Sequence, residues 1–98
     1  MKIVWTEPSR QDLREIFAYI AEENLRAATE FLSEIKRRVK VLQNNPQLGR
    51  KGRVEGTREL VLSGTHYLLP YRVKKQQVQI LAVFHTSKKW PGNIENNT

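Results

Sequence analysis

Three short apolar runs between Arg58 and His85 constrain what this chain can fold into. Each run is rich in Val, Leu, Ile, Tyr and Phe, the residue types that favour a pleated sheet. Only two short polar segments, Ser63 to Thr65 and Lys74 to Gln77, separate one run from the next. Parallel strands need a crossover of a dozen or more residues, so these connections predict an antiparallel meander of three strands.

Alternation along the runs predicts which side chains share a face of the sheet. In the second run one face is expected to carry Tyr67, Leu69, Tyr71 and Val73. Pro70 falls on the other face and has no N–H to donate to a neighbouring strand, so we expect its position at an edge or a bulge. The third run is apolar on both faces, which predicts a central strand covered on both sides. Its regular alternation would place on one face Val78, Ile80, Ala82 and Phe84.

The segment before the meander predicts one strand and two helices. Lys2 to Thr6 is β-branched and aromatic, as is typical of a strand. Glu7 to Ser9 opens a helix, because proline is tolerated in a first helical turn. Asn24 is a candidate N-cap for a second helix. The apolar stripe of the first helix is Leu13, Ile16, Phe17 and Ile20, and that of the second is Ala28, Phe31, Leu32, Ile35, Val39 and Leu42.

These elements predict an α+β fold, in which an N-terminal strand and an α-hairpin pack on an antiparallel sheet. We expect the first strand to lie beside the last, and Phe31, Leu32 and Ile35 to face the meander. Residues 1–91 are expected to form a single domain, and the polar residues 92–98 a disordered tail. Cysteine is absent, and no apolar run approaches the length of a membrane helix. A cytoplasmic location is the expectation.

The charge is distributed unevenly along the chain. Residues 1–35 hold four basic and seven acidic residues, whereas residues 36–98 hold thirteen basic and three acidic ones. The net charges are therefore −3 and +10, which together give the +7 of the whole chain. Such asymmetry predicts that the basic part meets an acidic partner, either nucleic acid or an acidic protein segment.

A loop from Gln47 to Thr57 carries part of this basic charge. It has three glycines but lacks the Gly-Lys-Ser/Thr ending of a P-loop, so it is expected to be a flexible basic connector rather than a nucleotide site. Together with the end of the chain it offers cations and one aromatic side chain to a partner. The predicted partner-binding residues are Arg50, Lys51, Arg53, Lys88, Lys89 and Trp90.

The order of strand, two helices and meander resembles the ParE/RelE superfamily of bacterial toxin–antitoxin toxins. The resemblance rests on Gly56 to Leu60, Tyr67 to Val73 and Val78 to His85, and it extends from Lys2 to about Trp90. It implies a small toxin held inactive by a labile antitoxin. RelE-like members are ribosome-dependent endoribonucleases with basic side chains on the open face of the meander, whereas ParE-like members inhibit DNA gyrase.

The sequence departs from the RelE-like ribonuclease pattern. Glu59, Val61 and Leu68 stand where RelE-like members have Lys or Arg, and Ser87 falls near an expected arginine. A carboxylate such as that of Glu59 would repel a phosphate. No catalytic residue is therefore assigned, and the residues left for an alternative ribonuclease site are Arg58, Arg72, His85 and Lys88.

The two histidines offer little further chemistry. His85 could act as a general acid or base, although a lone histidine at a strand end is more often a polar cap. His66 lies in a turn with no obvious partner, and two histidines alone do not make a metal site. No metal or cofactor is expected.

The favoured function is that of a ParE-like toxin that binds and inhibits DNA gyrase. Its expected partners are gyrase and an antitoxin with an acidic, amphipathic C-terminal arm. The alternative is a RelE-type mRNA interferase, whose partners would be the ribosome and mRNA. A nucleic-acid-binding module without toxicity would rest on the charge alone.

Overall fold

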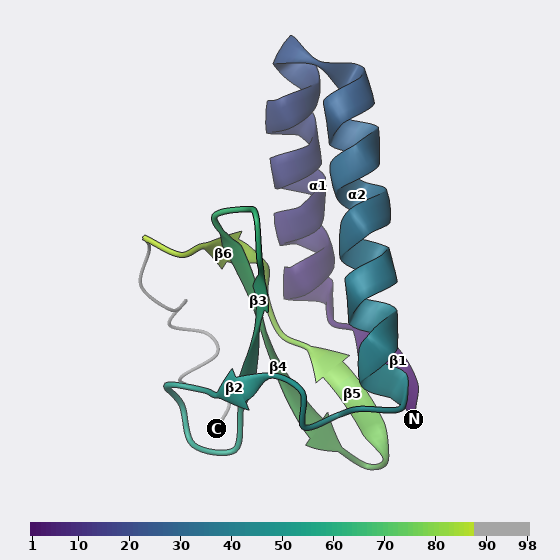
Figure 1. Cartoon of the computed structure of the whole chain (residues 1–98), viewed down its shortest axis with the longest axis vertical. Coiled ribbons are helices and arrows are strands. Elements are labelled where there is room, and N and C mark those ends of the chain that lie inside the picture. The colour runs from purple at the N-terminus through teal and green to yellow at the C-terminus, as the bar shows by residue number, and fades with distance from the viewer. Residues whose placement is uncertain (88–98) are drawn as a thin grey trace.

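The structure, a computed structural model, describes residues 1–87. Lys88, Lys89, Trp90 and the tail 92–98, which carried sequence predictions, lie outside these described residues. Two antiparallel helices form a hairpin that lies along one face of a sheet and extends beyond it (Figure 1). The elements are β1 (Lys2–Trp5), α1 (Glu7–Glu23), α2 (Leu25–Lys40), the 3-10 turn η1 (Val41–Gln43), β2 (Arg50–Lys51), β3 (Arg58–Leu62), β4 (Tyr67–Lys74), β5 (Gln77–Ile80) and β6 (Phe84–His85).

The sheet confirms the predicted meander and the predicted position of the first strand. Its order is β1-β5-β4-β3-β2, with β6 paired to β4. The strand β1 runs parallel to β5, and every other pairing is antiparallel. The sheet is therefore mixed rather than wholly antiparallel as expected. The α-hairpin explains the difference, because it is long enough to carry the chain across the sheet before the meander begins.

Pro70 lies at a bulge, one of the two positions predicted for it. Tyr71 is paired with Ile80 on β5, and Leu68 is paired with Phe84 on β6. Residues 69–70 of β4 therefore lie opposite residues 81–83, which connect β5 to β6. This one extra residue defines the bulge. Pro70 offers only its carbonyl oxygen here, and this oxygen accepts a hydrogen bond from the Leu81 N–H at 2.9 Å.

The bulge also corrects the predicted alternation of the third run. Val78 and Ile80 face the helices as part of the main core, but Ala82 and Phe84 belong to a second apolar cluster with Leu68 on the other face. Val83 takes the helix-facing place instead. An inserted residue reverses the phase of a strand, so a regular period cannot be read through it.

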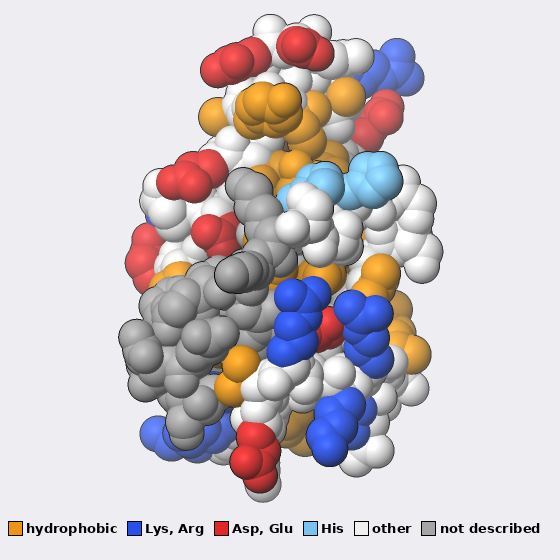
Figure 2. All heavy atoms as spheres, turned by 90° about the vertical axis from the view of Figure 1, so that its left-hand side faces the viewer, with side chains coloured by type: hydrophobic (Ala, Val, Ile, Leu, Met, Phe, Trp, Pro, Cys, Tyr) orange, Lys and Arg blue, Asp and Glu red, His pale blue; other side chains and the backbone are white. Residues whose placement is uncertain are grey.

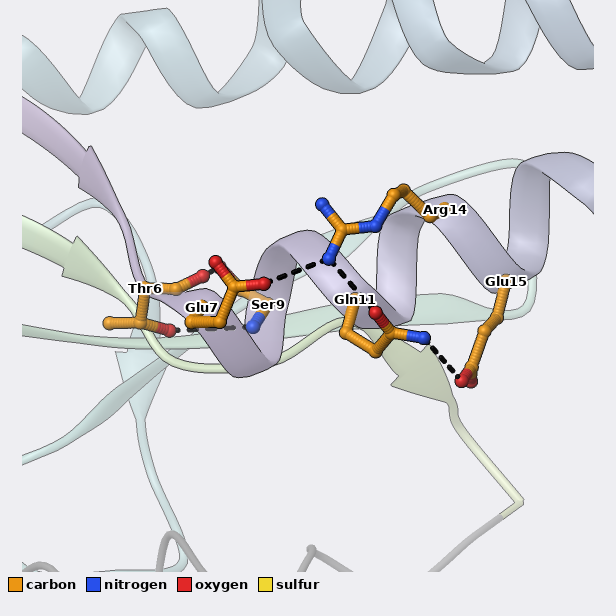
Figure 3. A network of polar contacts seen from close by, with 6 residues as sticks. All are labelled: Thr6, Glu7, Ser9, Gln11, Arg14 and Glu15. Atoms are coloured by element: carbon orange, nitrogen blue, oxygen red, sulfur yellow. Dashed lines mark hydrogen bonds and ion pairs between the residues drawn. The ribbon is translucent and has the colours of Figure 1, made fainter.

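Side-chain caps fix the N-termini of both helices. The Thr6 hydroxyl accepts a hydrogen bond from the Ser9 N–H, and the buried Ser9 hydroxyl donates to the Thr6 carbonyl at 2.7 Å. A chain of polar contacts continues along the exposed side of α1 through Arg14 (Figure 3). Asn24 ends α1 and caps α2 as predicted, since its side chain accepts from the Ala27 N–H at 3.0 Å.

The main core lies between the α-hairpin and the meander, as predicted. Phe31 meets Tyr67 edge to face, with ring centroids 5.3 Å apart. Leu32 does not join them; it lies in a groove between the two helices. The buried residues of this core are Ile35, Val39, Leu42, Leu60, Leu62, Leu69, Tyr71, Val78, Ile80 and Val83.

The loop after α2 is tied to the sheet, which corrects the expected flexible connector. It contains β2, and the buried Tyr71 hydroxyl accepts from the Gly49 N–H and donates to the Pro46 carbonyl, both at 2.8 Å. A Cβ at Gly49 would lie 2.6 Å from the Tyr71 ring, so this close approach requires glycine. Within residues 1–87, no helix is both long and apolar enough to cross a membrane.

Candidate partner-binding surfaces

Glu59 on β3 organises the open face of the sheet, which is the face turned away from the helices. Its side chain is only 2% exposed, and it lies between two arginines. Arg50 donates from Nε to Glu59 Oε1 at 2.9 Å, and a second Arg50 nitrogen lies 2.8 Å from the same oxygen. The Arg53 Nε and backbone N–H both lie 3.3 Å from Oε2. We call these three residues the Glu59 cluster.

Local backbone structure sets up this cluster. The register of β2 and β3 places Arg50 opposite Glu59. A tight turn then returns Arg53 to the same carboxylate, because the Gly52 N–H donates to the Thr57 carbonyl at 2.9 Å and the Thr57 N–H donates to the Val54 carbonyl. The Arg53 guanidinium carbon lies 6.0 Å from the centroid of the Phe84 ring. The carboxylate is thus neutralised by guanidinium groups, as a buried charge requires.

The two arginine side chains of the Glu59 cluster remain accessible to a partner. The Arg50 and Arg53 side chains are 58% and 45% exposed. Arg72 lies on the same face, two residues beyond Pro70 on β4, and its Nε donates to Gln79 at 2.8 Å. We call Arg50, Arg53 and Arg72 the basic face. Figure 2 looks onto this side of the molecule and shows Lys and Arg side chains over the sheet and Asp and Glu side chains toward the hairpin end.

Lys51 does not belong to the basic face. It is paired in register with Arg58, which lies on the helix-facing side of β3 together with Leu60. Alternation therefore directs the exposed Lys51 side chain away from the Glu59 cluster. Of the predicted partner-binding set, the structure brings together Arg50 and Arg53, places Lys51 apart, and does not describe the three residues beyond Ser87.

The residues of the alternative ribonuclease site do not converge. Arg58 faces the helix side and donates to the Gly49 carbonyl at 2.9 Å, whereas Arg72 faces the open side. His85 lies opposite Tyr67, at the far end of β4 from Arg72. Lys88 lies outside the described residues. A phosphodiester cleavage site needs its acid, base and cations around one phosphate, and the described residues of this set lack that arrangement.

His66 has a partner that the sequence did not reveal. Its ring stacks on the ring of His85 with centroids 5.5 Å apart, and His85 also meets Tyr67 edge to face. The Ser87 hydroxyl lies 2.7 Å from His85 Nδ1. His85 is therefore part of an aromatic row at the end of the sheet. Among residues 1–87, no group of three or more potential ligands could hold a metal ion.

A second surface lies on the α-hairpin, near the opposite edge of the sheet from β2. A groove there has an apolar floor and basic side chains at its rim. The floor comes from β1, α1 and α2, which are the first three elements of the chain. We call it the hairpin groove. Its apolar residues are Trp5, Leu13, Phe17 and Leu32, and its basic residues are Arg10, Arg14 and Lys36.

Comparison with known protein families assigns the chain to a family. Residues 3–90 match the family described as "ParE toxin of type II toxin-antitoxin system, parDE". This match spans nearly the whole chain. The chain belongs to the ParE toxin family.

Individual relatives agree with this assignment. The chain is 40% identical to the protein named Putative toxin Y4kP of Sinorhizobium fredii (strain NBRC 101917 / NGR234), over 92% of this chain and 93% of that protein. A structure of the chromosomal ParDE TA system from P. aeruginosa is 32% identical, with a TM-score of 0.78, and covers 87% of this chain and 95% of its own.

The RelE branch shares the fold at a greater distance. A chain in the structure of the intact E. coli RelBE toxin–antitoxin complex matches with a TM-score of 0.61 and 14% identity, over 86% of this chain and 94% of that chain. At this identity the likeness concerns the fold alone. The α+β fold and the membership of the ParE/RelE superfamily, both predicted from the sequence, are confirmed.

Sequence reasoning missed two features of this ParE-family toxin. The ion pairs of Glu59 could not be predicted, because both arginine partners lie in the loop before β3. No periodic pattern in that loop indicates how it pairs with β3. The hairpin groove was hidden because Phe17 and Leu32 were assigned to the core stripes. The spacing of Arg10 and Arg14 around Leu13 offered a signal, since residues four apart lie on one helix face.

Proposed function

We propose that this ParE-family toxin inhibits bacterial growth by binding DNA gyrase and cleaves no RNA. The observation that carries this proposal is the burial of Glu59 in the open face of the meander, where RelE-like ribonucleases are expected to carry cations. At this position the Glu59 carboxylate supplies no cation to stabilise a phosphorane, and the two arginines beside it form ion pairs with it. The divergence of Arg58, Arg72 and His85 supports the same conclusion.

We also propose that a cognate antitoxin neutralises the toxin, as part of a module that stabilises a plasmid or chromosomal locus. The similar P. aeruginosa structure is named as a toxin–antitoxin system, which supports such a partner. The hairpin groove suits an acidic, amphipathic arm, because its floor is apolar and its rim is basic. An additional contact of this arm with the loop from Arg50 to Arg53 stays a prediction.

The test compares two activities of one preparation of purified full-length toxin. We expect inhibition of gyrase supercoiling and, in cells, a DNA-damage response. We expect no cleavage of mRNA on translating ribosomes. Addition of the antitoxin should restore supercoiling.

Matched variants separate the two mechanisms. Arg72→Ala and His85→Ala remove residues of the alternative ribonuclease site. Codon-specific mRNA cleavage by the unmodified toxin, lost in either variant, would refute the gyrase proposal and establish the mRNA interferase alternative. Supercoiling inhibition in the absence of ribosomes, together with intact mRNA, supports gyrase as the target.

A further inference from the structure

We propose that the basic face, formed by Arg50, Arg53 and Arg72, binds the phosphate backbone of double-stranded DNA. This inference rests on the proposed function, because gyrase acts on duplex DNA and a toxin bound to gyrase lies close to that duplex. It adds a second ligand to the toxin and assigns a surface to it.

The three guanidinium groups are held in place before any ligand arrives. Glu59 fixes Arg50 and Arg53 through contacts of 2.8 to 3.3 Å, and Gln79 fixes Arg72 at 2.8 Å. An exposed arginine loses side-chain entropy when it binds an anion. Part of that loss has already occurred here during folding, so these arginines form a more effective anion site than mobile surface lysines do.

The contacts with Glu59 leave donors available for a phosphate. Arg50 reaches Glu59 Oε1 through Nε and one terminal nitrogen, and Arg53 reaches Oε2 through Nε. A guanidinium has five N–H donors, and its planar fork matches the oxygens of a phosphate. Both side chains are about half exposed, so the remaining N–H groups are accessible from solvent.

The basic face is wide enough to meet several phosphates. Its arginines belong to β2, to the turn after it, and to β4, with β3 between the two strands. Neighbouring strands are about 4.8 Å apart, so the face spans roughly 10 Å. Duplex DNA carries one negative charge per ~1.7 Å of its axis. Among the described residues, one Glu59 carboxylate pairs with the two guanidinium groups of Arg50 and Arg53, so the Glu59 cluster keeps a net positive charge.

The chemistry of the face favours a phosphate backbone over an acidic protein segment. A protein partner needs buried apolar anchors for a long-lived complex, and charges mainly speed its association. The hairpin groove offers such anchors, whereas the basic face presents arginines around a carboxylate. Phosphate contacts need no apolar anchor, because released counterions drive the binding.

Salt-dependent binding of the full-length toxin to DNA tests the proposal. The measurement is the fluorescence anisotropy of a labelled 20-base-pair duplex of arbitrary sequence, titrated at several salt concentrations. Each phosphate contact contributes about −0.9 to the slope of log K against log salt, so three contacts give a slope of about −3. We expect Arg72→Gln, which leaves the Glu59 cluster intact, to reduce the slope by about 1.

A charge-matched variant shows whether DNA binding depends on the arginines of the basic face or only on the net positive charge of the toxin. Arg50→Gln combined with Glu59→Gln removes one cation and one anion, so the net charge is unchanged. We expect its slope to fall by about 1 as well. Lys51→Gln lowers the net charge by one on the other side of β2, and we expect its slope to remain that of the unmodified toxin. Thermal unfolding confirms that each variant is folded.

Several outcomes would overturn the proposal. They are an absence of DNA binding, a slope that neither arginine variant changes, an equal loss in Lys51→Gln, or equally tight binding of polyglutamate of matched charge. Gyrase supercoiling measured with the same variants keeps the two proposals apart. A toxin that inhibits gyrase but does not bind DNA refutes this inference alone, whereas one that binds DNA but leaves gyrase active refutes only the proposed function.

Discussion

Glu59 lies directly opposite Arg50 across the β2–β3 pair, and their side chains form an ion pair with 2.9 Å between Arg50 Nε and Glu59 Oε1. The two partners are unequally exposed, since the carboxylate is buried and the guanidinium is more than half exposed. Removing one partner therefore has a different consequence from removing the other. An arginine left alone can be hydrated, but a buried carboxylate left alone cannot.

This asymmetry gives the first prediction. We expect Arg50→Gln combined with Arg53→Gln to lower the free energy of unfolding by roughly 3–5 kcal/mol, because it leaves Glu59 buried without its arginine partners. Adding Glu59→Met should recover most of that loss, since an apolar side chain of similar length needs no partner. Urea denaturation measures all three proteins. A triple variant no more stable than the double variant would show that the loop geometry, rather than the carboxylate, is responsible.

The same asymmetry affects any test of the loop as a partner site. Reversing the charge of Arg50 and Arg53 would surround Glu59 with further carboxylates, so a binding defect would be mixed with unfolding. Lys51 avoids this difficulty, because it lies away from the cluster. Substitutions at Lys51 therefore report on the loop charge alone.

Local sequence signals predicted the parts of this structure that depend on neighbouring residues. The Asn24 cap, the strands of the meander and the restriction of Pro70 to an edge or a bulge follow from side-chain chemistry and short-range periodicity. The switch of Ala82 to the opposite face of the sheet from Val78 and Ile80 was not predicted. Both faces of this run are apolar, so the sequence pattern looks the same with or without an inserted residue.

Contacts between distant segments could not be read from the sequence. The Glu59 cluster depends on how the loop at Arg50 is registered against β3, and the stacking of His66 on His85 depends on the pairing of β4 with β6. The hairpin groove depends on how the two helices meet β1. These are tertiary contacts, and the spacing of side chains along a single helix or strand does not determine them.

Asp12 provides a prediction about pH. Its half-buried carboxylate on α1 accepts a hydrogen bond from the Val83 N–H at 3.0 Å, and so joins the first helix to the bulge. Burial raises the pKa of Asp12 above 3.8, the Val83 N–H opposes this rise to a smaller extent, and Glu15 adds to it. A raised pKa in the folded state means that stability is lost as the pH rises through that pKa.

We therefore expect Asp12→Asn to change the pH dependence of stability. The amide oxygen can still accept from Val83 but carries no charge. The stability of the variant relative to the unmodified toxin should increase as the pH rises from below 4 toward 7. Urea midpoints over that range measure it, with Glu15→Gln as a control that should produce a smaller change. Parallel curves for Asp12→Asn and the unmodified protein would contradict the assignment.

Phe31 provides a prediction about the core. It packs edge to face on Tyr67 but is only partly buried. A fully buried phenylalanine truncated to alanine costs about 3–5 kcal/mol, so we expect Phe31→Ala to cost roughly 2–3 kcal/mol. Phe31→Leu keeps most of the apolar volume and should cost about 1 kcal/mol through loss of the aromatic pair. Denaturant unfolding measures both. A loss below about 0.5 kcal/mol for Phe31→Ala would mean that the contact is not made in solution.

The last prediction concerns the antitoxin and the hairpin groove. Rim charges act mainly on association, whereas buried apolar anchors set the lifetime of a complex. We expect Arg10→Glu combined with Lys36→Glu to slow association and weaken its salt dependence, with little change in the off-rate. Phe17→Ala should instead raise the off-rate about tenfold or more, as for the loss of an interface anchor worth about 1.4 kcal/mol.

A matched control lies on the same hairpin. Arg26→Glu combined with Lys40→Glu makes the same change in net charge at two α2 residues outside the groove. Surface-based kinetics with the antitoxin at low and high salt gives both rates, and circular dichroism confirms the fold of each variant. Equal slowing by both charge reversals would show that total charge, not the rim of the groove, steers the antitoxin. An off-rate unchanged in Phe17→Ala would exclude the groove floor from the interface, because an apolar anchor cannot be removed without shortening the lifetime of the complex.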